Sequence, residues 1–220
     1  MILDLIKNRY SLRNFDSKMP EFDDIKDILE AGRLAPSFLN LQPWHFIVIK
    51  DENTKKILCN LSGGQPHVLK APVVIACCAD FGVFDYENYK STLEKRVGMT
   101  QERLQYFLNS KALNPASLSQ EAVRQRGLEE VTYAISYMTL AAHEKGLETC
   151  IIGGIGNEYT QVAQDVYAVA KMELELPKNV SIAALLLVGY PAEDAVAPYK
   201  DRKDFEEVVS FEKYSLPEKP

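Results

Sequence analysis

Apolar residues recur along this chain in two patterns, one typical of helices and one typical of strands. Apolar positions at helical spacing predict a short helix at the N-terminus and longer helices over 20–32, 52–61 and 119–146. Short apolar runs predict strands over 44–50, 73–79, 149–152 and 181–190, and the run 73–79 is typical of a strand buried on both faces. The two patterns together predict a mixed α/β or α+β fold.

Residues 84–115 are a helical excursion that is rich in aromatic side chains. We expect this excursion to face a substrate or a partner, although aromatic residues at helical spacing are more often plain core. The long helix after it begins at a Ser119 cap and ends at Gly146. Alanines on its apolar face indicate the close approach of another helix, either within the core or across a dimer axis.

Length and composition indicate one globular domain over residues 1–220, with an acidic, proline-flanked tail at about 201–220. The chain is 46% hydrophobic and 25% charged, as ordinary globular proteins are. A formal net charge of -6 argues against a general nucleic-acid binder. The first ten residues lack the apolar region of a secretory signal, and no apolar run approaches a membrane span. Cytoplasm is the expected location, without a membrane partner.

The cysteines and histidines do not form a recognisable metal or redox motif. Four cysteines have neither a C-x-x-C spacing nor a zinc pattern, so we expect buried thiols. Cys77 and Cys78 are neighbours in one strand, which points them to opposite faces of the sheet. The three histidines are interpreted as structural or surface residues. There is also no P-loop and no G-x-S-x-G elbow.

The segment from Pro36 to Pro43 is predicted to be a rigid polar ledge. The two prolines fix φ and remove backbone donors, while Ser37, Asn40 and Gln42 supply polar side chains between them. Such a segment can hold the polar edge of a ligand. A capped loop, in which Ser and Asn bond their own backbone, is the alternative interpretation.

Three motifs in the right order resemble the FMN-dependent nitroreductase family. They are Arg9-Tyr10-Ser11-Leu12-Arg13, the Pro-Ser-x-x-Asn-x-Gln-Pro-Trp segment that ends at Trp44, and Lys200-Asp201-Arg202. The resemblance covers nearly the whole chain. It implies a central, mostly antiparallel sheet flanked by helices, in an intertwined homodimer with FMN sites at the interface. It also favours the dimer axis as the place where the alanines of the long helix pack.

The implied activity is the NADH- or NADPH-dependent two-electron reduction of electron-poor substrates such as nitroaromatics or quinones. No side chain is then needed as a catalytic acid or base, because the flavin carries the chemistry. Other reactions found in the family, among them dehalogenation and flavin fragmentation, are alternatives. A non-catalytic FMN carrier is a third hypothesis.

The resemblance also implies the cofactor-binding residues. Arg9, Arg13, Lys200 and Arg202 would surround the phosphate with Ser11, and Arg13 would stabilise negative charge on the reduced ring. The ledge would reach the flavin held by the other subunit. Gln65 is a candidate for the pyrimidine edge, or a loop residue in solvent. The full predicted set is Arg9, Tyr10, Ser11, Arg13, Pro36, Ser37, Phe38, Asn40, Gln65, Ile152, Gly153, Gly154, Lys200 and Arg202.

Two residues depart from the family pattern. Gly153 stands where better-known bacterial members have a glutamate, and Phe38 stands where many have a small hydroxyl residue. Gly153 and Gly154 lack a Cβ, which allows backbone N–H groups to approach a flat ring, although turns need glycine too. The change at Gly153 leaves flavin binding intact and bears on the choice of substrate.

Overall fold

The core of the molecule is a four-stranded antiparallel sheet with the strand order β1-β2-β4-β3. The computed structural model describes residues 1–155 and 160–215. The strands are β1 (Trp44–Ile49), β2 (Val73–Asp80), β3 (Glu148–Ile152) and β4 (Val180–Gly189). The two central strands are buried along nearly their whole length, as their continuous apolar sequence requires. The predicted mixed, mostly antiparallel fold is confirmed.

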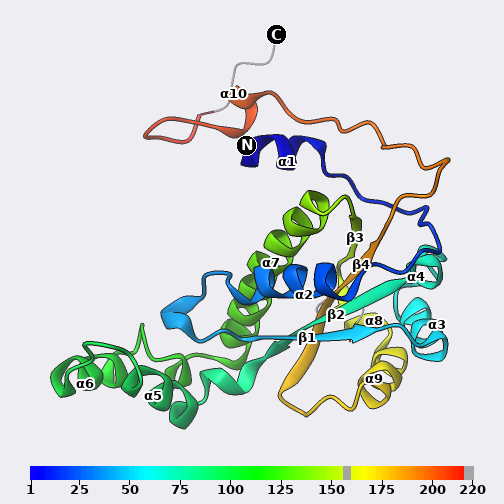
Figure 1. Ribbon diagram of the computed structural model, residues 1–220. Coiled ribbons are helices and arrows are strands. Elements are labelled where there is room, and N and C mark those ends of the chain that lie inside the picture. The colour runs from blue at the N-terminus through cyan, green and yellow to red at the C-terminus, as the bar shows by residue number, and fades with distance from the viewer. Residues whose placement is uncertain (156–159, 216–220) are drawn as a thin grey trace.

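Helices cover both faces of this sheet (Figure 1). Helices α2 (Phe22–Arg33) and α7 (Gln120–Glu144) pack on one face, and α3 (Glu52–Leu61) and α9 (Gln164–Glu173) pack on the other. Cys77 lies in the first of these two cores and Cys78 in the second, as the strand alternation predicts. All four cysteines are buried free thiols.

The apolar face of helix α7 packs against α2 and the sheet of the same chain. Its first turn is capped by the Ser119 hydroxyl, which accepts a hydrogen bond from the Ala122 N–H at 3.2 Å. Ala134 and Ala142 are fully buried in the core shared with α2. At the closest point, a Cβ added to Gly32 of α2 would lie 2.7 Å from the Met138 sulfur. The prediction that these alanines pack at a dimer axis is therefore wrong. Their small side chains allow α2 of the same chain to approach α7 closely.

The excursion packs against the ledge rather than forming a separate layer. It consists of the short helix η2 (Phe81–Phe84), α5 (Tyr86–Glu94), α6 (Gln101–Asn109) and η3 (Pro115–Ser117). Tyr89 is fully buried, and its hydroxyl donates to the Leu113 carbonyl at 2.8 Å. Tyr106, by contrast, is 66% exposed. Leu41 of the ledge is buried among Phe84, Tyr89 and the leucines of α5 and α6.

The C-terminal tail runs back past the end of α1 on the side opposite the excursion (Figure 1), where Lys200 bonds Arg9. Helix α1 (Ile2–Asn8) has no buried residue, and the tail carries the one-turn helix α10 (Phe205–Val208). Two further short helices are α4 (His67–Lys70), before β2, and α8 (Thr160–Val162), before α9. Within the described ranges, no helix combines the length and apolar character needed to cross a membrane.

Candidate functional site

The segment Arg9–Arg13 runs in extended form beside the edge strand β3. The Leu12 N–H donates to the Thr149 carbonyl at 2.9 Å, and Ser11 forms a parallel bridge with Thr149. Upstream, the Tyr10 N–H donates to Glu148 Oε2 at 3.3 Å, and Glu148 Oε1 lies 2.7 Å from His143 Nδ1. These contacts fix the backbone, so the side chains of Arg9 and Arg13 start from defined positions.

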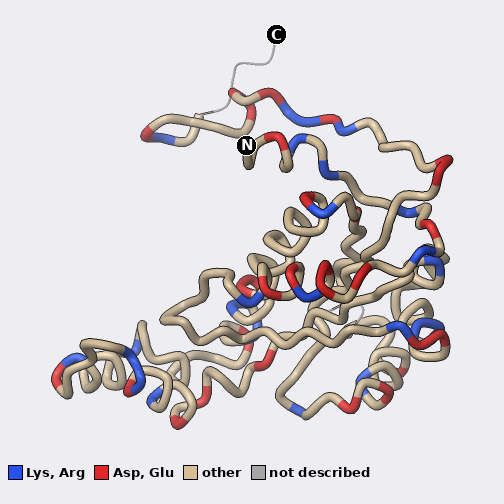
Figure 2. The backbone as a smooth tube through the Cα atoms, in the orientation of Figure 1, with Lys and Arg blue, Asp and Glu red and all other residues tan. Residues whose placement is uncertain are grey.

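Arg9 meets the C-terminal tail at this place. The Lys200 ammonium donates to the Arg9 carbonyl at 2.9 Å and also to the Lys7 carbonyl. Figure 2 shows the cations of the tail next to those at the end of α1. The Arg9 Nε is buried and has no hydrogen-bond partner. A buried guanidinium N–H without an acceptor is costly, so this position is suited to an anionic ligand.

Arg13 lies next to two residues that were not predicted, His67 and Lys70. His67 is buried in α4, and burial together with the Arg13 charge holds the pKa of its imidazole below the usual value. Its Nε2 is buried without a partner. Lys70 lines a hollow of about 530 Å³ together with Tyr10, Ser11 and Arg13. We call Arg9, Arg13, His67, Lys70 and Lys200 the basic cluster.

The charges of both arginines of this cluster reach the Cys150 thiol. Burial raises the pKa of Cys150, and the charges of Arg13 and Arg9 oppose that shift. The other predicted cation, Arg202, is exposed and donates to the carbonyl of its neighbour Asp201 at 2.6 Å. Gln65 is half-buried, and its side-chain amide donates to the Ser62 carbonyl at 2.9 Å, so it serves the turn before α4.

The glycines predicted to meet a ring lie at the far end of β3. Ile152 points into the core, and Gly153 and Gly154 line a hollow of about 220 Å³ with Ile151 and side chains of α7. A Cβ added to Gly153 would meet nothing within 4 Å, whereas Gly154 has a φ of +78°. Four residues of extended chain separate Thr149 from Gly153, which is about 13 Å. The start of this edge strand therefore lies beside the Arg9–Arg13 segment, and an open glycine follows its end.

The ledge is held in an unusual backbone conformation. Leu39, Asn40 and Gln42 have φ values of 48°, 58° and 51° around the short helix η1 (Phe38–Asn40). The Gln42 N–H donates to the Ser37 hydroxyl at 3.0 Å, and the Gln42 amide donates to the Asn40 carbonyl at 3.3 Å. Ser37 thus bonds its own loop, as the capped-loop interpretation proposed. Pro36 and Asn40 are exposed beside it.

A carboxyl group lies directly beneath the ledge. Glu130 of α7 is only 3% exposed, and its Oε1 accepts a hydrogen bond from the Phe38 N–H at 3.2 Å. Burial raises the pKa of Glu130 to about 7. The Arg126 guanidinium lies 4.4 Å from the centroid of the Phe38 ring. Glu130 Oε2 is buried without a partner, and no sequence signal singled this residue out.

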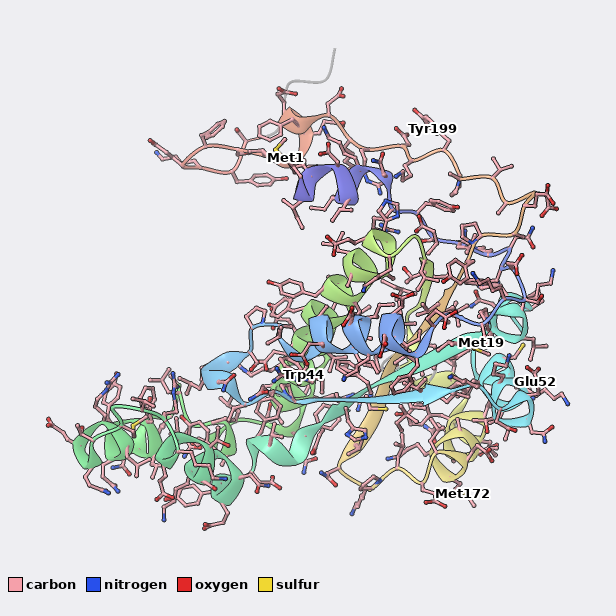
Figure 3. The ribbon with its side chains drawn as sticks, in the orientation of Figure 1. Met1, Met19, Trp44, Glu52, Met172 and Tyr199 are labelled. Carbon is pink, nitrogen blue, oxygen red and sulfur yellow. The ribbon has the colours of Figure 1, made fainter. Side chains whose placement is uncertain are left out.

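The ledge and the basic cluster lie at opposite ends of α2 (Figure 1). This helix has 12 residues, and at 1.5 Å per residue it is about 18 Å long. In Figure 3, Trp44 at the end of the ledge is well separated from Tyr199, which precedes Lys200. The buried polar atoms without partners in the described residues are Arg9 Nε, His67 Nε2 and Glu130 Oε2. They mark these two places and nowhere else in that part of the chain.

A helix-covered antiparallel sheet, with the Arg9–Arg13 segment beside the start of one edge strand and two glycines after its end, defines an α/β protein. Residues 6–190 match the model of the nitroreductase family, and the chain belongs to this family. The predicted oxidoreductase class is thereby confirmed. Among residues 1–155 and 160–215, no three His, Cys, Asp or Glu side chains are grouped as metal ligands would be.

Relatives of this chain carry names that agree with the family. It is 29% identical to an NADH dehydrogenase of Thermus thermophilus over 194 residues, which is 87% of each chain. It is 27% identical to an FMN reductase [NAD(P)H] of Bacillus subtilis over 192 residues, which is 87% of this chain and 66% of the relative. The solved structure of B. megaterium NfrA1 superposes with a TM-score of 0.73 at 28% identity, covering 97% of this chain and 75% of the other.

Proposed function

We propose that this protein is a homodimeric, cytoplasmic FMN enzyme that uses NADH or NADPH to reduce electron-poor substrates such as nitroaromatics or quinones. The observation that carries the proposal is the pair of buried, partnerless nitrogens, Arg9 Nε and His67 Nε2, in one basic cluster. Buried polar atoms are nearly always paired, so the unpaired Arg9 N–H favours an anionic ligand. The unpaired His67 nitrogen, which feels the charge of Arg13, favours a ligand that also has a polar edge. The family and the names of its relatives favour FMN as that ligand.

The basic cluster would hold the phosphate end of the cofactor. Arg9 offers a buried N–H, and Lys200 is already anchored on the Arg9 carbonyl. A guanidinium fork matches phosphate oxygens, and the resulting charge-assisted bonds are among the stronger ones in proteins. Arg13 lies close enough to His67 for its charge to act on the imidazole, and this pair would meet the polar edge of the ring. Tyr10 and Ser11 line the same hollow.

The far end of β3 would meet the ring. FMN, when bound, supplies the hydride chemistry, which is two-electron transfer between a nicotinamide and an acceptor. Gly153 leaves open space at the end of β3, and the adjoining hollow is walled by Ile151 and α7. The role of these residues is to orient flat substrates and to exclude water, rather than to donate or accept protons.

The ledge gives the reason to expect a dimer. It is exposed at Pro36 and Asn40, yet it lies a helix length away from the basic cluster of its own chain. In a two-fold dimer, the ledge of one subunit would complete the site of the other. The four free cysteines suit a reducing compartment, which is the support for the cytoplasm.

The test is to purify the protein, release its chromophore by denaturation and identify it. We expect about one FMN per chain, and bleaching of the yellow colour by NADH or NADPH without oxygen. Reoxidation of the bleached protein by a panel of nitroaromatics, quinones and halogenated aromatics then separates reduction of the first two from dehalogenation. Colour without bleaching would favour a carrier. Failure to take up added FMN would contradict the proposal.

A further inference from the structure

We infer that Glu130 is a positioning residue, which holds the ledge through the Phe38 amide and couples the closing of the ledge to the uptake of one proton. The inference rests on the proposed function, because a closed ledge matters for catalysis only if the ledge completes a flavin site. Glu130 itself touches no candidate cofactor residue except Phe38 of its own chain.

The first step is that the ledge needs an external anchor. Three residues other than glycine with positive φ fall within four positions, and each such residue costs on the order of 1–3 kcal/mol unless its surroundings enforce it. Within the ledge, two turns of backbone hydrogen bonds and the Ser37 and Gln42 side chains hold the loop together. Besides the Arg126 guanidinium over the Phe38 ring and the Asp80 N–H bond to Pro43, two contacts from elsewhere hold the middle of the ledge. One is the burial of Leu41 in the excursion, and the other is the hydrogen bond from the Phe38 N–H to Glu130.

The second step is that the ledge also buries the carboxyl group. Glu130 is 3% exposed although it lies one turn after Arg126, which is itself covered by the Phe38 ring at 4.4 Å. The Glu130 Oε2 is buried and has no hydrogen-bond donor among the described residues, so an ionised carboxylate is poorly supported in this place. Movement of Phe38 away from α7 would admit water to the carboxylate and remove that penalty.

The third step is the sign of the coupling. Burial raises the pKa of Glu130 to about 7 in this structure, while a carboxyl group in water has a pKa near 4.3. The closed ledge therefore binds a proton between about pH 4.3 and pH 7 that the open ledge does not bind. Closing is favoured at low pH, and this advantage is lost as the pH rises through 7.

The charges on α7 around Glu130 are few. After burial, the largest influence on the pKa of Glu130 is the hydrogen bond from the Phe38 N–H, which lowers it. Arg126 also lowers this pKa, and the neighbouring Glu129 raises it. Glu129 is exposed and accepts a hydrogen bond from the Tyr133 hydroxyl at 2.7 Å. Burial is the largest cause of the shift, so neither neighbour reverses its direction.

The elements packed near Glu130 add little charge of their own. Residues 34–43 include no titratable side chain. On α2, Glu30 and Arg33 are exposed and pair with each other at 2.6 Å. His45, just after the ledge, is also exposed. A pH dependence that disappears on changing Glu130 alone is therefore assigned to this carboxyl group.

The experiment compares FMN dissociation constants of the wild type and Glu130→Gln between pH 5.5 and 8.5. Gln keeps an acceptor for the Phe38 N–H but does not titrate. The ratio of the two constants removes the titration of FMN itself and of every other residue. We expect the ratio of the wild-type constant to the Gln constant to rise by about threefold to tenfold per pH unit between pH 5.5 and about 7, where tenfold is the limit for one proton. Above pH 7 the ratio should level off, because Glu130 is then ionised whether the ledge is open or closed. Parallel profiles would overturn the inference.

Two further variants keep the test sharp. Glu129→Gln makes the same chemical change one residue away on the exposed side, and its profile should follow the wild type. Glu130→Leu leaves the Phe38 N–H without an acceptor, so it should bind FMN more weakly than Glu130→Gln at every pH. Equal binding by the folded Leu and Gln variants would show that the hydrogen bond does not position the ledge.

A readout without flavin separates this inference from the proposed function. Trp44 is the sole tryptophan and follows the ledge directly. Its fluorescence in the flavin-free wild type should change with a midpoint near pH 7, and this transition should be absent in Glu130→Gln. That result would support the coupling even if FMN were not the ligand. Identical titrations of Trp44 in both proteins would overturn the coupling whatever the protein binds.

Discussion

The ledge and the basic cluster differ in how their polar groups are satisfied. The ledge is assembled from neighbouring residues, and its Ser37 and Gln42 bond each other. The basic cluster draws on separate stretches of the chain, and it leaves the Arg9 and His67 nitrogens unpaired. A loop that is held by its own bonds and by Glu130 has its shape before a ligand arrives. A cluster with unpaired donors is incomplete until an acceptor arrives.

The largest expected effect concerns the anchoring of the ledge. Leu41→Ala removes a buried side chain from the core of the excursion, and such changes cost about 2–5 kcal/mol of unfolding free energy. Urea unfolding measures this loss. The matched control is Leu34→Ala at a 62% exposed position next to the ledge, for which we expect a change within about 0.5 kcal/mol. Equal losses in the two variants would mean that the excursion does not support the ledge.

The second prediction concerns the basic cluster. Arg9→Ala removes a charge-assisted bond worth about 1.5–3 kcal/mol, so FMN affinity should fall by roughly tenfold to a hundredfold. Arg33→Ala, at an exposed arginine paired with Glu30, is the control and should leave affinity unchanged. Arg202→Ala sharpens the test, because Arg202 is exposed here and bonds only its neighbour's carbonyl among the described contacts. FMN affinity equal to wild type in both Arg9→Ala and Arg202→Ala would show that these two cations do not bind the cofactor.

The third prediction tests whether the open space beside Gly153, after the end of β3, belongs to the flavin site. Gly153→Ala adds a methyl group where nothing lies within 4 Å, so we expect the melting temperature to stay within a few degrees, as for surface changes of about 0.5 kcal/mol. FMN affinity or the rate of bleaching by NADH should nevertheless fall, because the methyl group would occupy the space of a ring. An unchanged flavin site would place the ring elsewhere.

The smallest expected effect is a pH dependence at His67. Its pKa is lowered by burial and by Arg13, so the unfolded chain takes up this proton before the folded one does. Flavin-free wild type should lose stability as the pH falls below about 6.5, the unfolded value, and His67→Gln should lose less over the same range. Chemical denaturation at pH 7.5 and 5.5 compares the two slopes. Equal slopes would show that His67 is not held neutral.

The sequence predicts the local features of this molecule well. The strand predicted over 44–50 is observed as Trp44–Ile49, and the Ser119 cap begins α7 as expected. These features depend on neighbouring residues, whose spacing is visible in the chain. The polar character of the ledge was predicted for the same reason, although its positive φ values were not.

Features that depend on distant contacts escaped prediction. Glu130 was not selected because its partner, Phe38, lies 92 residues away and only the packing of α7 brings them together. His67 and Lys70 were missed for the same reason, although they lie two and five positions after Gln65 and precede a buried strand. The alanines of α7 were assigned to a dimer axis because a close helix approach does not reveal, from one sequence, whether the second helix is in the same chain.

The central claim is that the ledge of one subunit completes the basic cluster of the other. Mixing two inactive variants tests it most directly. One chain carries Ser37→Ala and Asn40→Gly, where glycine suits the positive φ, and the other carries Arg9→Ala and Arg13→Ala. In the mixed dimer, one site collects all four changes and the other collects none. With random pairing, half of the dimers are mixed, and we expect about a quarter of wild-type activity. No activity, in a sample in which mixed dimers are shown to form, would contradict the claim.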